Sequence, residues 1–596
     1  MAEAKGMRLR APSAGVVFFL AAIAVVFADL VDGDPVFRDS DDIVRLLQIR
    51  DLLNDNAYFD LTLPFIRMPE AYVSHYSRLV DLPYYLIAKA LAPVAGADTA
   101  LTIATWVWPV VLLAGFCVLA VQVMRRITGG LGRLEAILAA LVLAPAILEF
   151  EPARIDHHNF QLVLLMGVLA GMVGPARLGG IAIGLAASAS IAIGLECLPL
   201  LVAALGGLAL AAIFDMGDAR AKLAHAGGAL ALSAVPLAIA SFGPAVAQVQ
   251  CDTVSQPWLV AMLAGGAILT AAPAAWALPV FAGRSARAVA ARFGSIAIPG
   301  AVLVAALALR YPECALGHYN IVDPLSHRLW LDGLPQERGL IFQFATGRFP
   351  LALFCVLWGF MLIAALPPAW RELRAGRYGL PVVLAVALAA FAVFLMLDRS
   401  MRVSAGPIGL LLPIAIALIR AEPAAALQGP AARRWLAAAI AVPALAFGGL
   451  YAAVPKVPFV FTALDQMHVD RCKLPDAGVL DRVAPGSIMA TFGAAVKIVT
   501  GHPQHTVAAF TVHRAAPGMK RMFTAFTSTD PAARAEALAP FDYVAICARE
   551  ADFPGMEDVP LYASLVRGEP VPGVARIEPD NPSGFRLYRI DHSALR

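Results

Sequence analysis

The stretch LEAILAALVLAPAILEFEPARIDHHNFQLVLLMGVLAGMVGP, residues 134–175, contains two apolar runs separated by a short polar turn. The runs, 134–149 and 159–175, have the length of membrane spans, because a helix rises about 1.5 Å per residue and the hydrocarbon layer is roughly 30 Å thick. The turn between them holds acids, an arginine and two histidines. This stretch therefore predicts two transmembrane helices joined by a turn rich in potential ligands.

The composition of the whole chain agrees with a membrane protein. Of its 596 residues, 60% are hydrophobic and only 15% are charged, whereas roughly a quarter of the residues of a soluble protein are charged. The net charge of +3 gives no reason to expect a nucleic-acid partner. Membrane lipid is the expected surrounding.

Thirteen apolar runs can be placed as transmembrane helices. A cleavable signal peptide is the alternative for the first run, but no small-x-small cleavage site precedes Asp32 and many spans follow, so we predict a retained helix. The expected spans lie near 14–30, 101–124, 134–149, 159–175, 178–195, 197–214, 225–242, 257–280, 293–310, 349–367, 379–397, 403–420 and 435–453.

Positive residues recur on one side of this topology. Counting from a cytoplasmic N-terminus, the inner loops carry arginine and lysine, as the positive-inside rule requires. An odd number of spans then puts the C-terminus outside. Because the spans are rich in alanine and the loops are short, we expect a multi-pass protein of the bacterial inner (plasma) membrane with a periplasmic C-terminal domain. The inner residues include Arg125, Arg126, Arg133, Arg177, Arg220, Lys222, Arg284, Arg287, Arg292, Arg371, Arg374, Arg377, Arg420, Arg433 and Arg434.

Two domains are expected. Residues 1–454 form the α-helical transmembrane domain with a large first outside loop, 31–100, and residues 455–596 form a small α/β domain. The signals in the tail are β-like runs at Ser487–Thr491, Ala508–Val512 and Tyr543–Cys547 and a helix-like run at Pro531–Leu538.

The seven cysteines show no metal-finger spacing. Three lie inside apolar runs, where a thiol behaves as a small hydrophobe. The other four face the oxidising side in this topology, where disulfides such as Cys251–Cys314 and Cys472–Cys547 would persist, although other pairings remain open. The three apolar cysteines are Cys117, Cys197 and Cys355.

Carboxylates follow the first span directly. Asp39, Asp41 and Asp42 stand before a helix-like segment. Carboxylates are hard oxygen ligands that suit Mg²⁺ or Mn²⁺, and they also serve as bases. The alternative is an acidic helix start at the membrane edge.

Further along the same loop, His75, Arg78 and Asp81 recur at roughly helical spacing. The arginine would suit the phosphate headgroup of a lipid. An interfacial helix with tyrosine and arginine anchors explains the segment equally well.

The turn EFEPARIDHHNFQ, residues 149–161, is the sharpest local signal. Asp156 and His158 offer an oxygen and an imidazole nitrogen to one cation, and His157 lies between them. Glu196 interrupts a later apolar run. A carboxylate at membrane depth is costly and favours a functional role, whereas one at a helix end is only solvated.

Two arginines stand at an outside helix junction, against the inside preference of arginine. Arg399 and Arg402 follow Asp398 and would bind an anionic lipid phosphate through charge-assisted hydrogen bonds. A structural ion pair with Asp398 is the alternative. The loop 311–348, which contains Glu337, and the pair His513-Arg514 are weaker signals.

Taken together, these segments resemble the GT-C superfamily of polyprenyl-phosphate-dependent glycosyltransferases, and especially the catalytic subunits of oligosaccharyltransferases. DSDD at 39–42 looks like the first acidic motif of the family, and Asp156 with His158 looks like the second. The junction at Arg399 and Arg402 is similar to the lipid-phosphate site of the family. Glu337 matches the glutamate of the acceptor-side loop.

The resemblance implies a fold, a donor and a cofactor. The fold would be GT-C-like, and the donor a sugar on a polyprenyl phosphate or pyrophosphate. Asp41, Asp156 and His158 would hold a divalent metal ion, Mg²⁺ or Mn²⁺. His158 stands where oligosaccharyltransferases carry a carboxylate, and the tail lacks the Trp-Trp-Asp motif that reads a glycosylation sequon. The acceptor is therefore left open among a glycan, a lipid and a protein.

Other classes of protein remain as alternatives. A transporter or flippase of lipid-linked glycans would use intramembrane charges such as Glu196, but the acids concentrate at one face and no repeated half is evident. A polysaccharide polymerase or ligase, which would also use a lipid-linked substrate in the membrane, is harder to exclude. A receptor would need only one or two spans.

Overall fold

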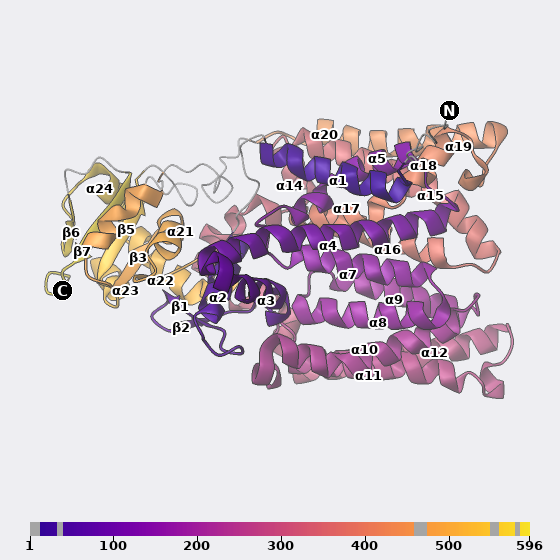
Figure 1. Cartoon of the computed structure of the whole chain (residues 1–596), viewed down its shortest axis with the longest axis horizontal. Helices are drawn as coiled ribbons and strands as arrows, with labels where there is room; N and C mark the ends of the chain where they lie inside the picture. Colours follow the sequence, from indigo (N-terminus) through magenta and orange to yellow (C-terminus); the bar gives the residue numbers. More distant parts are fainter. Residues whose placement is uncertain are drawn as a thin grey trace, which may run out of the picture.

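The computed structural model describes residues 12–31, 40–457, 472, 474–548, 559–578 and 584–595. A long bundle of helices occupies one end of the molecule, and a small sheet with its own helices occupies the other (Figure 1). Asp39, one of the predicted site residues, lies outside the described residues.

Nine helices of the described chain are long and apolar enough to cross a membrane. Two shorter helices, α17 (Met401–Gly409) and α18 (Leu412–Ile419), belong to one pair that is bent by 55°. If this pair is counted as one span, it is the tenth. The nine are α1 (Ala14–Val31), α4 (Ala97–Thr128), α8 (Ala176–Ile193), α10 (Ala219–Phe242), α11 (Gln256–Ala275), α12 (Ala286–Arg310), α15 (Phe349–Arg374), α16 (Gly379–Met396) and α19 (Gly429–Pro443), which continues into α20 (Gly449–Ala453).

The remaining predicted spans contain shorter helices. The run 134–149 is divided into α5 (Arg133–Val142) and α6 (Ala144–Ile147) because Pro145, near the start of α6, lacks the N–H that would continue the helix. Two other runs correspond to α7 (His158–Val173) and α9 (Leu198–Ile213). The polytopic α-helical fold is therefore confirmed, while the number of thirteen spans stays a prediction.

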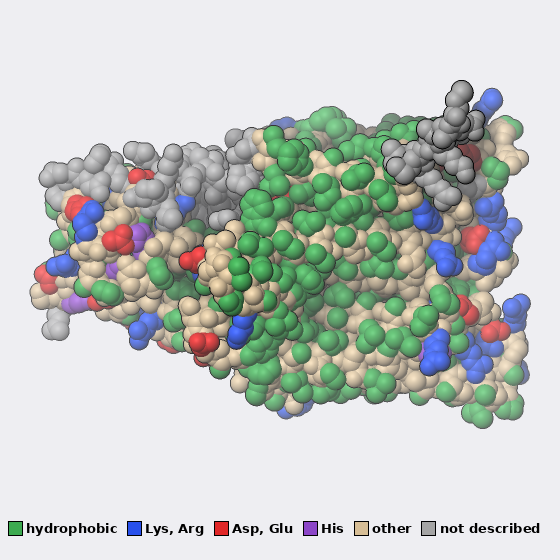
Figure 2. Space-filling model, viewed as in Figure 1, with side chains coloured by type: hydrophobic (Ala, Val, Ile, Leu, Met, Phe, Trp, Pro, Cys, Tyr) green, Lys and Arg blue, Asp and Glu red, His purple; other side chains and the backbone are tan. Residues whose placement is uncertain are grey.

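Two loops at the sheet end of the bundle contain helices and strands of their own. The first loop contains α2 (Ser40–Leu53), β1 (Thr62–Arg67), β2 (Ala71–Val73) and α3 (Arg78–Ala95). The loop 311–348 contains α13 (Pro324–Leu329) and α14 (Leu340–Ala345), with 3₁₀ turns between them. Lysine and arginine side chains gather at the opposite end of the bundle (Figure 2). This is the distribution that the positive-inside rule predicts for the inner loops.

The sheet has seven strands in the order β2-β1-β4-β3-β5-β7-β6. Strands β1, β4, β3 and β5 run parallel, and the outer pairs are antiparallel. All five residues of β5 are buried, as expected of a central strand. The other strands are β3 (Ser487–Ala490), β4 (Thr506–Val507), β5 (Tyr543–Cys547), β6 (Val574–Arg576) and β7 (Phe585–Ile590), and the helices are α21 (Phe492–Gly501), α22 (Ala516–Thr527), α23 (Pro531–Leu538) and α24 (Pro560–Arg567).

One predicted strand of the tail is wrong. Residues 508–512 form no strand, and the ladder ends with Val507. The reason is that Gly518 of α22 packs directly against the Ala508 carbonyl oxygen, where even a Cβ would not fit. This helix therefore takes the place that a longer β4 would need.

Two disulfides lie among the described residues, Cys251–Cys314 and Cys472–Cys547. The first joins the loop before α11 to the loop after α12, and the second joins the segment before β3 to β5. The other three cysteines are free and buried. Both pairings suggested by the topology are therefore present.

Candidate active site

The turn before α7 forms a compact cluster of ligand atoms. Asp156, His157 and His158 each offer one atom, and these atoms lie within 4.8 Å of one another. A hydrogen bond joins Asp156 to His158 Nδ1, and the two imidazole rings stack with centroids 4.5 Å apart. A carboxylate with imidazoles suits Mn²⁺ or Zn²⁺ better than Mg²⁺, which prefers oxygen ligands.

His157 is held between two carboxylates. Its Nδ1 lies 2.5 Å from an Asp156 oxygen, and its Nε2 lies 3.1 Å from a Glu196 oxygen. Burial acts to lower the pKa of His157, but the two carboxylates outweigh this effect and raise the pKa to about 10. The imidazole is thus protonated near neutral pH. A metal that used His157 as a ligand would have to replace this proton.

Glu196 faces the same cluster from the loop after α8. Its second oxygen accepts a hydrogen bond of 2.8 Å from Gln161. Burial would raise the pKa of Glu196, yet the charge of His157 holds the pKa well below its usual range. About a third of this side chain is exposed, so Glu196 is an ionised carboxylate with access to a ligand.

Asp41, at the start of α2, reaches the cluster through a tyrosine. The Tyr76 hydroxyl donates to Asp41, and the Tyr76 ring lies 6.3 Å from that of His157. Burial, followed by the neighbouring Asp41, raises the pKa of Tyr76 well above its usual value, so the phenol keeps its proton. Asp41, which is half-buried, is therefore linked to the histidine cluster through Tyr76.

Asp42, the next residue, is held differently. It accepts hydrogen bonds from the backbone N–H groups of Ile155 and Asp156 at 2.8 and 2.9 Å, and from Arg154 at 3.1 Å. Asp42 and Arg154 are almost fully buried. These contacts favour a positioning role, in which Asp42 ties α2 to the turn that carries Asp156.

The two junction arginines each pair with a glutamate. Arg402 lies 3.4 Å from Glu149, and Arg399 lies 3.0 Å from Glu337. The Tyr319 hydroxyl also donates to Glu337, at 3.3 Å. Asp398 pairs instead with Arg348, at 3.2 Å.

The electrostatics of Arg399 connect this junction to the cluster. Burial acts to lower the pKa of Arg399, but the pKa lies above its ordinary value because phenolic and carboxylate groups face it. These groups are Tyr319, Glu337, Glu196 and Asp41. A partly exposed guanidinium thus lies in the field of the same carboxylates that surround the histidines.

Arg78 and Asp81 belong to a separate buried cluster. Arg78 donates to the Tyr58 carbonyl at 2.7 Å and to Asp81 at 3.2 Å, while Arg45 donates to Asp81 at 2.8 Å. Arg78 and Asp81 are fully buried. A guanidinium enclosed in this way offers no face to a phosphate, so the contacts favour a structural role.

His75 faces the C-terminal domain. Its ring lies 4.4 Å from that of His513, and the Tyr72 hydroxyl lies 3.3 Å from its Nδ1. His513 and Arg514 in turn bind Asp252, at 2.8 and 2.7 Å. The weak signal of the pair His513-Arg514 therefore marks a contact between the domains.

No protein-family model and no curated protein matches this chain. Solved structures do match it. The oligosaccharyltransferase of Archaeoglobus fulgidus in its apo form aligns with a TM-score of 0.60 and 13% identity, over 96% of this chain and 74% of that chain. A complex of the same protein with Zn and sulfate gives a TM-score of 0.51 and 12% identity, over 96% and 73%.

A third structure is the oligosaccharyltransferase AglB from Archaeoglobus fulgidus with an inhibitory peptide and a dolichol-phosphate. It aligns with a TM-score of 0.59 and 13% identity, over 97% of this chain and 74% of that chain. The chain has an oligosaccharyltransferase fold. This confirms the GT-C-like membrane fold that the resemblance implied.

Three further residues contact the carboxylates of the site, and the sequence alone does not indicate them. Tyr76, Tyr319 and Gln161 contact Asp41, Glu337 and Glu196 respectively. Both tyrosines lie in segments that carry predicted site residues. No spacing in the sequence, however, indicates which carboxylate each tyrosine contacts.

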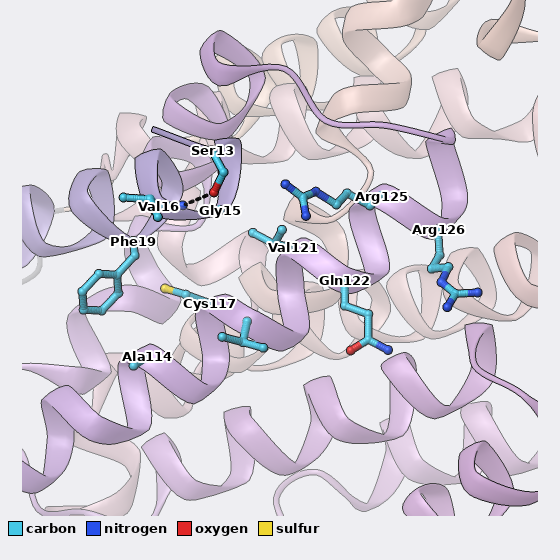
Figure 3. A pocket seen from close by; sticks show the side chains of 11 residues that line it. Ser13, Gly15, Val16, Phe19, Ala114, Cys117, Val121, Gln122, Arg125 and Arg126 are labelled. Atoms are coloured by element: carbon cyan, nitrogen blue, oxygen red, sulfur yellow. Dashed lines mark hydrogen bonds between the residues drawn. The ribbon is translucent and has the colours of Figure 1, made fainter. Parts of the chain in front are cut away.

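A large cavity of the oligosaccharyltransferase fold lies elsewhere. It has a volume of about 620 Å³ and lies between the start of α1 and the end of α4 (Figure 3). Ser13 and Arg126 are among its lining residues, whereas none of the cluster residues lines it. The cavity is therefore separate from the candidate active site.

Proposed function

We propose that the protein is a membrane glycosyltransferase that moves a sugar or oligosaccharide from a polyprenyl phosphate or pyrophosphate to an acceptor at the outer membrane face. The observation that carries the proposal is the cluster Asp156, His157 and His158, with Asp41 and Glu196 beside it, at the sheet end of an oligosaccharyltransferase fold. We further propose the bacterial inner membrane as its location, with the sheet domain in the periplasm.

The reaction breaks the bond between the anomeric carbon and the lipid phosphate oxygen and forms a bond between that carbon and an acceptor oxygen. A divalent metal, bound by Asp156 and His158 with Asp41 nearby, would neutralise charge on the leaving phosphate. Arg399 is placed to hold that phosphate, because its guanidinium is partly exposed and pairs with Glu337 at 3.0 Å.

The acceptor proton needs a base. Glu337, hydrogen-bonded by Tyr319 and paired with Arg399, and Asp41, hydrogen-bonded by Tyr76, are the two carboxylates whose neighbours orient them for this step. The protonated His157 keeps Glu196 ionised beside them, so the site presents negative charge to a metal and positive charge to a phosphate.

The metal in this proposal is Mn²⁺ or Zn²⁺. The proposed ligands, the Asp156 carboxylate and the His158 imidazole, support this choice over Mg²⁺, which prefers oxygen ligands. The Archaeoglobus fulgidus structure that contains Zn concerns that protein, and it makes Zn²⁺ the natural first metal to test here.

The test is transfer of sugar from a labelled polyprenyl-phosphate donor pool by the purified full chain, with EDTA and with added Mn²⁺ or Zn²⁺. Asp156→Ala should lower turnover by about a hundredfold or more, because the metal contributes several kcal/mol of charge stabilisation. Asp41→Ala should lower turnover as well. Asp98→Ala removes an exposed carboxylate at the start of α4 and should leave turnover unchanged.

Metal content gives an independent measurement. The wild type should retain about one metal ion per chain after dialysis against trace Zn²⁺ or Mn²⁺, and His158→Ala should retain much less. Movement of the donor between leaflets without cleavage, insensitive to Asp156→Ala, would instead indicate a transporter.

A further inference from the structure

The cavity between α1 and α4 has apolar walls and a polar mouth. Val16 and Phe19 of α1 and Val118 of α4 line its walls, whereas Ser13, Arg125 and Arg126 lie at its mouth. In Figure 3 the Arg125 side chain extends from α4 toward Ser13 at the start of α1. The cavity is therefore shaped for a molecule with an apolar chain and a polar end.

The surroundings of the cavity are those of a lipid-facing surface. Val16 is 48% exposed and Val118 is 66% exposed, and both lie in helices long and apolar enough to cross a membrane. The mouth lies at the end of α4 that is remote from the sheet (Figure 1), and lysine and arginine side chains gather at this end of the bundle (Figure 2). By the positive-inside rule this is the cytoplasmic leaflet.

Two other arginines at the same end of the bundle pair with carboxylates. Arg377 binds Glu372 at 2.5 Å, and Arg420 binds Glu135 at 3.1 Å. Arg125 and Arg126 are exposed, and no carboxylate of the described residues pairs with either. Part of their position is explained by the carbonyl end of α4, which attracts cations. That explanation accounts for the charges but not for a cavity beneath them.

We infer that this cavity binds an anionic phospholipid of the cytoplasmic leaflet. The acyl chain lies along Val16, Phe19 and Val118, and the headgroup phosphate binds Arg125 and Arg126. The charge of the site favours a lipid with net negative charge over a zwitterionic one. The inference does not depend on the proposed transfer reaction.

The test is native mass spectrometry of the full chain titrated with phosphatidylglycerol or with phosphatidylcholine of the same acyl chains. The wild type should retain phosphatidylglycerol preferentially. Because each basic residue near an anionic surface contributes about 1 kcal/mol, Arg125→Gln with Arg126→Gln should reduce this preference by roughly 30-fold. Arg284→Gln with Arg287→Gln removes two exposed arginines of the same membrane side that do not line the cavity. This matched variant should keep the preference.

A second variant tests the shape of the cavity without changing its charge. Val118→Trp fills the apolar wall from an exposed helix position and should also reduce phosphatidylglycerol retention. Equal retention by wild type, the Arg125/Arg126 variant and Val118→Trp would overturn the inference. Deletion of residues 2–11, which contain Lys5, Arg8 and Arg10, should leave the preference in place. If only this deletion abolished it, the binding site would be that segment and not the cavity.

Discussion

At the scale of single residues, Glu151 shows how strongly the turn before α7 is buried. Only 1% of the residue is exposed. Burial, together with the neighbouring Asp29, raises the pKa of Glu151 to about 9. The carboxyl is therefore neutral in the folded protein near pH 7, although it would be ionised in the unfolded chain.

This pKa gives a prediction with a definite sign. An acid whose pKa is raised by folding destabilises the folded state increasingly as the pH rises from its unfolded pKa toward its folded one. Glu151→Gln should raise the apparent Tm at pH 8 by a few degrees and should change it little at pH 4.5. Thermal unfolding in detergent at the two pH values measures this.

The control for that measurement is Glu70→Gln, at an exposed position of the first loop, which should give the same Tm as wild type at both pH values. A loss of stability in Glu151→Gln of equal size at pH 4.5 and pH 8 would show that the carboxyl makes a specific contact in the fold.

The sequence indicated some of the site residues because their chemistry is local. Asp156 and His158 are two positions apart, and the turn between two spans brings them together without help from the rest of the fold. The contacts of Tyr76 with Asp41 and of Glu196 with His157 join different segments, so no spacing reveals them. The structural role that the contacts of Arg78 favour is hidden from the sequence for a related reason, since burial by other segments decides what its guanidinium contacts.

At the scale of elements, small residues decide how the helices pack. Gly180 and Gly184 lie one turn apart on α8 and face α10. A Cβ at Gly180 would lie 2.5 Å from the Lys222 carbonyl oxygen, and one at Gly184 would collide with the Ala226 carbonyl oxygen. Such small residues at intervals of four let two membrane helices approach closely.

Gly184→Ala should therefore lower the apparent Tm by several degrees, because the α8 and α10 backbones must move apart. Gly265→Ala is the matched control on α11, since no atom lies within 4 Å of its added Cβ. That variant should be neutral or slightly stabilising, because alanine favours a helix more than glycine does. Equal effects of the two substitutions would contradict close packing at Gly184.

Hydropathy predicted where the helices occur but not how they pair. Each of the thirteen apolar runs contains helical structure, because length and apolarity alone determine a membrane span. The failed strand at 508–512 shows the limit of local patterns. Its residues have the character of a strand, but the close approach of Gly518 excludes the partner that a strand would need.

At the scale of the whole molecule, the two ends of the chain form one sheet. β1 of the first loop pairs in parallel with β4, at Ile66 and Val507. A second contact lies nearby, where Arg514 binds both oxygens of Asp252 at 2.7 Å and the His513 ring meets the His75 ring edge-on, with centroids 4.4 Å apart. The Cys251–Cys314 disulfide fixes the residue next to Asp252.

These contacts predict that Asp252 docks the C-terminal domain over the candidate active site. Asp252 and Arg514 are mostly buried, and removal of one partner of a buried pair costs roughly 3–5 kcal/mol. Asp252→Asn should therefore increase hydrogen exchange in β2 and at the start of α22, while the Tm of the helical bundle stays the same. The double variant Cys251→Ser with Cys314→Ser should increase exchange in the same segments, because it releases the loop that carries Asp252.

The control is Glu578→Gln, which breaks an exposed ion pair with Arg482 inside the C-terminal domain. Exposed pairs contribute about 0–1 kcal/mol, so exchange at the domain contact should stay at the wild-type level. If Asp252→Asn gave the same exchange as Glu578→Gln, the pairing of β1 with β4 alone would hold the domain in place.

If exchange rose as expected, the distance between Tyr319 and His513, whose rings lie 6.0 Å apart, would become variable. The loop that carries Glu337 would then lose its contact with the C-terminal domain, and sugar transfer should fall without any change in metal content.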